Sequence, residues 1–552
     1  MSSKNQDLPA QADTIIIGSG MGALAAAICL TRQGQRVIVL EQHNVPGGWC
    51  HSFLIAGHRF SPGCHYIGQL GEGQTTRELY QGLGIANELV FFEMNQQAYE
   101  HCWIGSDKID LKSSFDELYN HFSALFPAEK DGLHKYLSTI NRVSTQLGLI
   151  SQMQNFWDHL TIPWRTRHLG KYGLFSLQKV IDWHIKDPLL KAVLNTQWGN
   201  HGLAPHQASF PYHAAVMDHY SNGGFYPMGG GAAIVKAMTN MIKRNGGQLL
   251  TSQKVGRILL EEGKIKRALG VELESGQRIL ANTIISNADP QKTYLELVGK
   301  QHLSGRLIKQ IDKTKYSCTS LVLFLVVDMD VRKAGLDSGT VWVTPNVNQK
   351  QDRKTQTSEL PDFSELFISC SSLKDPTSFD GIHHTLEVIA LQNNALFNQF
   401  ELETAVRSEA YLKFKEQISV KMIGALEKVL PGIRDSIVHQ ELGTPVTNRR
   451  YIGSTNGSIY GTEKSFWQIG AFGYKSKSEI ENLYLCGASI LANGIAGATY
   501  SGVQTAAQIL GSSQAELLKA DGSQKLRVYS AEDSSFYPDW LKQKISTRKE
   551  RG

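Results

Sequence analysis

The sequence has few cysteines for its length, and they are not spaced for metal binding or cross-linking. Seven occur among 552 residues, at positions 29, 50, 64, 102, 318, 370 and 486. None belongs to a Cys-x-x-Cys pair, and an odd number at irregular spacing does not indicate a disulfide framework. We therefore expect reduced, mostly buried thiols, as in a reducing compartment, and no metal site.

The sequence also lacks a strong charge bias and a long uninterrupted apolar run. Its formal net charge of +5 is too slight to favour a nucleic-acid partner. Residues 1–12 are polar, so no secretory signal is visible. The uncharged stretch 482–515 is interrupted by glycine, asparagine and serine, whereas a spanning helix needs about 20 predominantly apolar residues. We expect no signal peptide or transmembrane span, and a location on the cytoplasmic side.

Near its start the sequence has a glycine-rich turn between a predicted strand, residues 13–17, and a predicted helix. In register with these elements are the residues of a dinucleotide fingerprint: Gly18, Gly20, Gly22, Ala23 and Glu41. Gly18 permits a tight turn, Gly20 lets a pyrophosphate approach the backbone, and Ala23 allows close helix packing. Glu41 ends a second predicted strand, where a carboxylate can accept both hydroxyls of an adenosine ribose.

One glycine fingerprint does not distinguish FAD from NAD, but a second glycine turn favours FAD. The predicted strand 483–485 enters a turn at Gly487, and a predicted helix follows from about residue 496. FAD is long, so its ribityl chain and ring need a second holding point. Amides near Gly497 and Ala498, at a helix N-terminus, would suit that part of the cofactor. The alternative for glycines 494–502 is close helix packing.

Together these motifs resemble the phytoene-desaturase-like flavoenzymes, the retinol saturase branch more than the carotenoid isomerases. The resemblance covers about residues 12–511. Five stretches carry it: 18–41, 47–53, 63–68, 226–231 and 483–502. In two places the chain departs from the saturase pattern, because Ser61 replaces an acidic residue and residues 489–493 match neither branch.

The resemblance implies bound FAD and a hydrophobic, isoprenoid-like polyene as substrate. It also implies which residues hold the cofactor. These are Gly18, Gly20 and Gly22 at the pyrophosphate, Glu41 at the ribose, Gly47 and Gly48 at the same phosphates, the Val255 backbone at the adenine, and Gly487, Gly497, Ala498 and Thr499 at the ribityl chain and ring.

The nucleotide-binding elements lie at both ends and in the middle of the chain, which predicts two interleaved domains. We expect an α/β fold, with a Rossmann-like FAD-binding domain of the glutathione-reductase (GR2) type and an α+β substrate domain. The FAD-binding domain would comprise residues 12–90, 221–298 and 472–512. Residues 91–220 and 299–471 would form the substrate or membrane-facing domain, and 513–552 a polar, partly disordered tail. The stretch 75–221 has a mainly helical pattern.

The source of electrons and protons is open. Residues 229–231 are glycines that follow Tyr-Pro-Met without an apolar strand, so we expect no dedicated NAD(P)H domain. Electrons would come from a transient donor such as NAD(P)H or from a partner protein. Saturation of a double bond also needs a proton donor. His65 and Tyr66, in a glycine-flanked segment, are the candidates, and structural hydrogen bonding is the alternative for both.

A polyene substrate also predicts contact with a membrane. Moving about twenty carbons from lipid to water costs on the order of 15 kcal/mol, so a diffusing enzyme would rarely meet its substrate in solution. Residues 157–183 interleave tryptophans with arginines and lysines, the composition of an interfacial patch. The alternative is a helix packed on the core with a solvated basic face.

Several activities fit these residues. The first is a flavin-dependent reductase that saturates one double bond of a retinoid, carotenoid or related isoprenoid. The second is a carotenoid desaturase or cis–trans isomerase. A non-catalytic flavin protein that carries a lipid, or another flavin oxidase such as an amine oxidase relative, also remains open.

Overall fold

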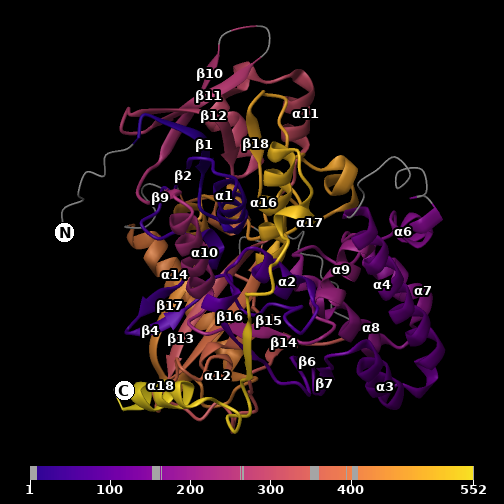
Figure 1. Ribbon diagram of the computed structural model, residues 1–552. Helices are drawn as coiled ribbons and strands as arrows, with labels where there is room; N and C mark the ends of the chain where they lie inside the picture. The colour runs from indigo at the N-terminus through magenta and orange to yellow at the C-terminus, as the bar shows by residue number, and fades with distance from the viewer. Residues whose placement is uncertain are drawn as a thin grey trace.

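Two seven-stranded sheets organise the chain (Figure 1). The structure is a computed structural model, and it describes residues 9–151, 162, 164–261, 263, 266–347, 360–392, 394–400 and 408–550. The first sheet lies at the top of Figure 1 and the second below it. The strands of the first come from residues 11–40, 248–286 and 483–485, whereas those of the second come from residues 100–111 and 319–443.

The first sheet has the order β10-β11-β12-β1-β2-β9, and β18 pairs with β12 beside this path. Its strands are β1 (Gln11–Ile17), β2 (Val37–Leu40), β9 (Gln248–Leu250), β10 (Val255–Glu261), β11 (Arg267–Leu273), β12 (Arg278–Ser286) and β18 (Leu483–Leu485). Strand β1 runs parallel to both β2 and β12. All four residues of β2 are buried, as is typical of parallel strands covered on both faces.

Helix α1 (Met21–Arg32) follows β1 and packs closely against α16 (Gly494–Leu510) and α10 (Gly231–Arg244). Every residue of α1 except Arg32 is buried. The closest approach to α16 is at Gly22, because a Cβ added at Gly502 would overlap the Gly22 carbonyl group. The two helices that frame the predicted cofactor site are thus held together by glycines.

The second sheet has the order β17-β13-β16-β15-β14-β6-β7. Its strands are β6 (Glu100–Ile104), β7 (Asp107–Leu111), β13 (Thr319–Val327), β14 (Thr340–Thr344), β15 (Leu366–Cys370), β16 (His384–Gln392) and β17 (Ile437–Gly443). All nine residues of β13 are buried. In sequence, the continuous apolar run of this strand indicates a core position, and the structure places it there.

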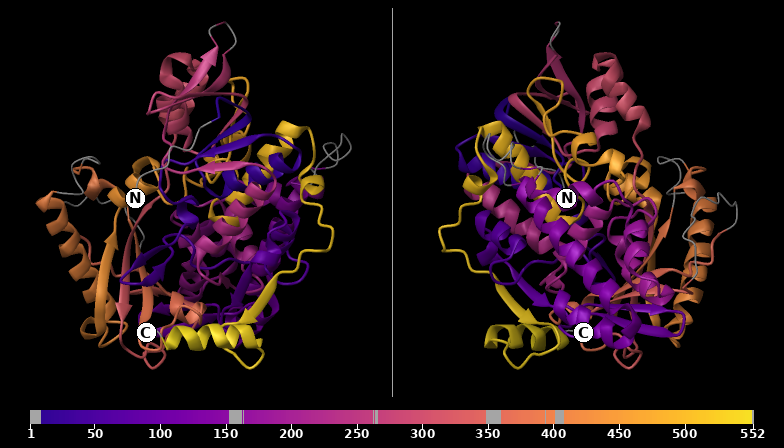
Figure 2. Two further views of the ribbon diagram at one scale, coloured as in Figure 1. Left: turned by 60° about the vertical axis from the view of Figure 1, so that its left-hand side comes forward. Right: turned by 90° about the vertical axis from the view of Figure 1, so that its right-hand side faces the viewer.

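Helices from residues 115–219 gather beside the second sheet, on the right of Figure 1. They are α3 (Phe115–Leu125), α4 (Lys130–Ser151), α6 (Arg167–Tyr172), α7 (Leu177–His184), α8 (Pro188–Asn195) and α9 (Phe210–His219). On the other side of the same sheet lies α14 (Glu409–Glu427), which the turned views of Figure 2 separate from this group. Smaller elements are β3 (Phe53–Ile55), β4 (His58–Phe60), α2 (Thr75–Gly82), α11 (Gly305–Lys313), α12 (Ser371–Lys374) and α15 (Pro445–Tyr451).

The expectation of a mainly helical region over residues 75–221 is wrong between residues 90 and 111. Residues 90–111 form β5 (Val90–Glu93), β6 and β7. Strand β5 lies between β8 (Phe225–Pro227) and β19 (Arg527–Ser530) in a third sheet. The glycines at 229–231 therefore do follow a strand, although β8 lies outside the parallel sheet. Strands β6 and β7 form a local hairpin, whereas β5 and the outer side of β6 pair with distant parts of the chain, which local periodicity does not reveal.

The C-terminal residues are more ordered than the sequence indicates. Residues 513–550 contain α17 (Gln514–Leu517), β19 and α18 (Asp539–Lys549). Tyr537 and Leu541 are buried, and the Tyr537 ring lies 6.0 Å from that of Phe92. In Figure 1, α18 lies along the base of the second sheet.

The predicted α/β class, with a Rossmann-like unit and a second region built on its own sheet, is confirmed. Among the described residues, none of the helices has the length and apolar character needed to cross a bilayer.

Candidate flavin and substrate site

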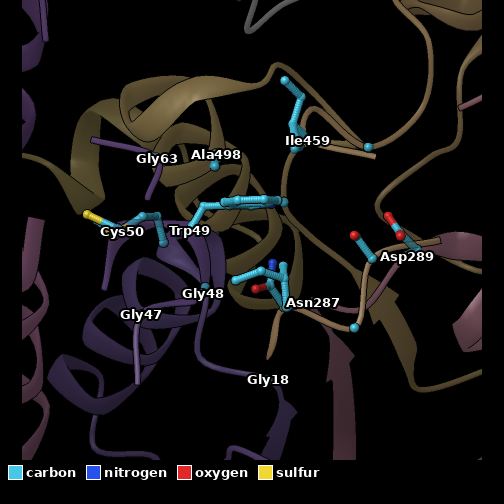
Figure 3. Close-up of a pocket in the computed structure, with 18 of the residues that line it drawn as sticks. Gly18, Gly47, Gly48, Trp49, Cys50, Gly63, Asn287, Asp289, Ile459 and Ala498 are labelled. Carbon is cyan, nitrogen blue, oxygen red and sulfur yellow. The ribbon is translucent and has the colours of Figure 1, made fainter. Parts of the chain in front are cut away.

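A cavity of about 400 Å³ lies where the two sheets meet, and both contribute to its wall. Its residues include the turn after β1, the end of β2, the segments 47–51 and 62–66, the residues after β12, and the start of α16. The second sheet adds Val322, Trp342, Phe367, Ile389 and Leu391. Figure 3 shows the Trp49 ring extending into this cavity between Ala498 and Asn287.

The turn after β1 presents bare backbone to the cavity. Gly18 has a φ of +86°, in the left-handed region that favours glycine. Helix α1 begins at Met21, and no side chain caps its N-terminus. Its first amides are therefore free for an anionic ligand, which the positive end of the helix dipole also favours. A Cβ at Gly20 would overlap the Asn287 side chain, so this position admits only glycine without a shift.

Glu41 is held at the end of β2 by hydrogen bonds. Its Oε2 accepts the backbone N–H of Ser19 at 2.9 Å and the Ser19 hydroxyl at 2.6 Å. Its Oε1 accepts the His43 amide at 2.7 Å, and the Gly47 amide donates to the Ser19 hydroxyl at 3.0 Å. A carboxylate offers about four acceptor positions, so one remains for a ligand hydroxyl. Sequence reasoning missed Ser19, which joins the two glycine segments.

The C-terminal glycine turn borders the cavity from the other side. Gly487 has a φ of +108°, and its amide donates to the Ser501 hydroxyl at 3.0 Å. Helix α16 starts at Gly494 with no side-chain cap, and Ile495 and Ala498 line the cavity. The site thus has two uncapped helix N-termini, as the sequence predicts for a long cofactor.

Most of the predicted site residues meet in this one cavity. Those that line it are Gly18, Gly20, Glu41, Gly47, Gly48, His65, Tyr66, Val255, Gly487 and Ala498. Those that do not are Gly22, Ala23, Gly497 and Thr499. Gly22 faces α16 instead, because an added Cβ would lie 2.9 Å from the Ala498 carbonyl oxygen. Thr499 is fully buried, and its hydroxyl donates to the Ile495 carbonyl at 2.6 Å.

His65 is paired with a buried carboxylate from the second sheet. Its Nδ1 lies 3.0 Å from Oε2 of Glu387, which has no exposed surface. Lys374, also fully buried, donates to the His65 carbonyl at 2.9 Å and to Ser369 at 2.8 Å. Burial lowers the pKa of Lys374 to about 8, and the charge of Glu387 opposes that shift.

Tyr66 contacts a second buried carboxylate. Its hydroxyl donates to Oε1 of Glu100 in β6, and the Asn200 amide donates to the same hydroxyl at 3.0 Å. Glu100 also accepts from Trp342 Nε1 at 3.1 Å and from Gln197 at 2.8 Å. Burial, the largest cause, raises the pKa of Glu100, and these hydrogen bonds oppose that shift. Sequence reasoning missed both Glu100 and Glu387, which come from strands far from residue 66.

The residues fit FAD. The uncapped α1, the bare backbone at Gly20 and the remaining acceptor position on Glu41 suit a pyrophosphate and a ribose. Val255 lies two residues beyond Gln253, whose amide donates to the Glu41 carbonyl at 2.8 Å, and it lines the same cavity as Ile495 and Ala498 of α16. The wall of the cavity also has apolar side chains, among them Phe367, Ile389 and Leu391, which suits a hydrocarbon.

Comparison with known proteins decides the family. Residues 24–510 match the flavin-containing amine oxidoreductases. The chain belongs to this family. As a flavin-containing oxidoreductase it uses FAD, and the prediction of an FAD-dependent oxidoreductase is confirmed at this level.

Individual relatives of this flavin-containing oxidoreductase span nearly its full length. All-trans-retinol 13,14-reductase of Danio rerio is 28% identical, over 89% of this chain and 84% of its own. Prolycopene isomerase 1 of an Oncidium hybrid cultivar is 27% identical, over 90% of this chain and 83% of its own. A redesigned putrescine oxidase has a similar fold, with a TM-score of 0.62 at 16% identity, covering 91% of this chain and 99% of that one.

Two further groups lie outside the cavity of the flavin-containing oxidoreductase. His58, Asp380 and His383 each bring one possible ligand atom within 4.8 Å of the others, a grouping that the sequence did not predict. Asp380 Oδ2 accepts the His383 Nδ1–H at 2.9 Å.

The predicted interfacial patch, residues 157–183, is described only in part, because Trp157 lies outside the described residues.

Within the described part of that patch, apolar side chains are exposed. Trp164 is 81% exposed, Leu174 is 69% exposed and Trp183 is 48% exposed. Basic residues lie among them, and Lys179 Nζ sits 4.9 Å from the centre of the Phe175 ring. This arrangement has both components of an interfacial surface, apolar side chains and positive charge.

Proposed function

We propose that this flavin-containing oxidoreductase saturates one carbon–carbon double bond of a hydrophobic polyene, such as a retinoid, a carotenoid or a related isoprenoid. The observation that carries the proposal is that one cavity is lined both by the residues suited to FAD and by apolar side chains. The glycine turns and Glu41 occupy one part of it, and Phe367, Ile389 and Leu391 form an apolar part beside His65 and Tyr66. The likeness to retinol 13,14-reductases supports the same substrate class.

The chain's own residues would orient the polyene, exclude water and supply a proton. Bound FAD, once reduced, supplies the hydride for such a reaction. The neighbouring carbon then needs a proton from a group within hydrogen-bond reach. His65 and Tyr66 are the candidates in the wall, and each is held by its own buried carboxylate. The apolar residues would keep the hydrocarbon dry and in one orientation.

Electron supply and membrane contact belong to this proposal. Within the described residues, the turn after β1 is the only glycine fingerprint that follows a strand of the parallel sheet, and FAD would occupy it. No second site of this kind is left in the described chain to hold NAD(P)H, so the flavin would be reduced by NAD(P)H acting transiently or by a partner protein.

The polyene would enter from a bilayer, with the protein bound peripherally through residues 164–183. The exposed Trp164 and Leu174 support that contact.

A second candidate is cis–trans isomerisation of a carotenoid with bound FAD, without net reduction. The likeness to a prolycopene isomerase, at 27% identity against 28% for the retinol reductase of Danio rerio, favours keeping it. Product mass separates the two activities. We expect dithionite-reduced, FAD-loaded protein, offered a panel of retinoids and carotenoids, to yield a product heavier by two hydrogens. An unchanged mass with a new isomer would instead indicate the isomerase, and loss of two hydrogens a desaturase.

A further inference from the structure

Glu100 lies directly behind the cavity wall, with no exposed surface of its own. It meets three donors: the Tyr66 hydroxyl, Trp342 Nε1 and the Gln197 amide. Tyr66, Asn200 and Trp342 line the cavity. Building on the proposed function, we propose that Glu100 is a positioning residue that controls where Tyr66 directs its proton, and that Glu100 refills Tyr66 after each transfer.

The direction of one hydrogen bond carries this proposal. When Glu100 is ionised it can only accept, so the single Tyr66 proton is held on its carboxylate and is not offered to the cavity. When Glu100 is protonated it can donate to the Tyr66 oxygen. The Asn200 amide already donates to that oxygen at 3.0 Å. Both lone pairs of the hydroxyl are then used, and its proton turns away from Glu100, toward Asn200 Oδ1 at 3.2 Å and the cavity that Tyr66 and Asn200 line.

The surroundings suit both protonation states. Burial raises the pKa of Glu100 and so favours the protonated acid. The N–H groups of Trp342 and Gln197 and the positive charge of Lys374 oppose that shift and would stabilise the carboxylate once it forms. The titratable groups that face Glu100 and Tyr66 are Tyr99, Cys102, Tyr220 and Lys374. Of these, only Lys374 carries a charge near neutral pH.

The proton transfer balances. Hydride addition to one carbon of the double bond leaves an electron pair on its neighbour. That pair takes the Tyr66 proton, so a C–H bond forms and the tyrosine O–H bond breaks. The Glu100 O–H bond breaks in turn and the tyrosine O–H bond is restored. The net change is one proton lost by Glu100, which solvent returns before the next turnover, and the two electrons come from the reduced flavin.

The proposal predicts a pH dependence with a definite sign. The competent form has Glu100 protonated, so turnover should fall as pH rises through its raised pKa. In Glu100→Gln, the Trp342 N–H still needs an acceptor, so the amide oxygen takes the place of Oε1 and holds the Tyr66 proton at every pH. We expect kcat of FAD-loaded E100Q to be at least about tenfold below wild type at pH values below the pKa of Glu100. The decline of kcat with rising pH, the pH limb of the wild-type profile, should be absent from this variant.

A spectroscopic measurement tests the same point without turnover. Infrared difference spectra of wild type minus E100Q should contain the C=O band of a protonated carboxylic acid, and that band should vanish as pH rises. His101→Gln serves as control, because His101 is the next residue of β6 and its ring contacts Asp110 and Asp337 instead. This control should keep both the band and the pH limb.

Two results would overturn the inference. One is the absence of a titrating carboxylic acid band in the wild-type minus E100Q difference. The other is an unchanged pH limb in E100Q that still saturates a polyene, in which case the proposed function stands and the role of Glu100 does not. If wild type saturates no polyene, the proposed function fails, and the infrared titration still decides whether Glu100 is held protonated.

Discussion

His65 Nδ1 lies 3.0 Å from Oε2 of Glu387, although 322 residues separate the two in sequence. Glu387 is fully buried, and its Oε1 accepts the Ser61 amide at 3.1 Å. One carboxylate of the second sheet thus fixes the segment that carries both candidate proton donors. The contact joins the loop that follows β4 to the second sheet, beside the cavity that His65 lines.

Removing the charge of Glu387 should impair turnover without removing the cofactor. In Glu387→Gln the His65 ring and the Ser61 amide lose a charged acceptor, so we expect kcat to drop at least about tenfold. FAD content, read from the visible absorption of the purified protein, should match wild type, since Glu387 is not among the residues of the glycine turns. Loss of FAD together with activity would instead make Glu387 a purely structural residue.

Ser19 should contribute to FAD affinity by holding Glu41 and the Gly47 amide in place. Ser19→Ala removes the hydroxyl that links Glu41 to the Gly47 amide. Hydrogen bonds to charged groups contribute about 1.5–3 kcal/mol, so we expect the Kd of the apoprotein for FAD to rise about tenfold or more. Fluorescence titration measures it. Ser113→Ala, which removes a hydroxyl bonded to the Gln96 carbonyl, should leave the Kd unchanged, and equal effects of the two variants would refute this account.

The contact between α1 and α16 should tolerate no side chain at Gly502. In Gly502→Ala the new methyl group would overlap the Gly22 carbonyl, and overpacking of this kind costs about 1–3 kcal/mol of unfolding free energy. FAD retention should fall as well, because both helices border its site. Gly148→Ala is the matched control, since its Cβ would meet nothing within 4 Å. Chemical denaturation of both variants would contradict this prediction if G502A were as stable as G148A.

The exposed apolar residues on either side of α6 should govern binding to lipid. Replacing Trp164 and Leu174 together by serine removes side chains that are 81% and 69% exposed. We expect partitioning onto vesicles with anionic lipid to weaken about tenfold or more, as measured by flotation. Phe536→Ser removes another exposed aromatic ring, 85% exposed, and should not change flotation. A loss of the same size in both would show that the contact is not specific to this surface.

The cofactor half of the site could be predicted from sequence because its signals are local. The spacing from Gly18 to Glu41 is set by one strand, one turn and one helix, and the structure keeps them in that order. Even here, sequence did not distinguish a glycine that faces the ligand from one that faces another helix. Gly20 lines the cavity, whereas Gly22 packs on α16. That distinction depends on where residues near 500 return in space.

The substrate half could not be predicted in the same way because its signals are distant. Glu100 lies on a short strand within a stretch that has a mainly helical pattern, and that strand pairs with its neighbour β7 on one side and with residues 340–344 on the other. Glu387 lies between Leu386 and Val388 in the apolar part of β16 and is not distinguished by any motif. The two carboxylates are recognised as site residues only in the folded structure, where the second sheet places them against residues 65 and 66.

The most direct test is an anaerobic single turnover. Protein loaded with one FAD per chain is reduced with a stoichiometric amount of dithionite and mixed with one equivalent of a polyene in detergent. We predict that the flavin absorption returns and that one polyene molecule heavier by two hydrogens forms per flavin. A flavin that stays reduced with every retinoid and carotenoid offered, while each is recovered at its original mass, would contradict the account.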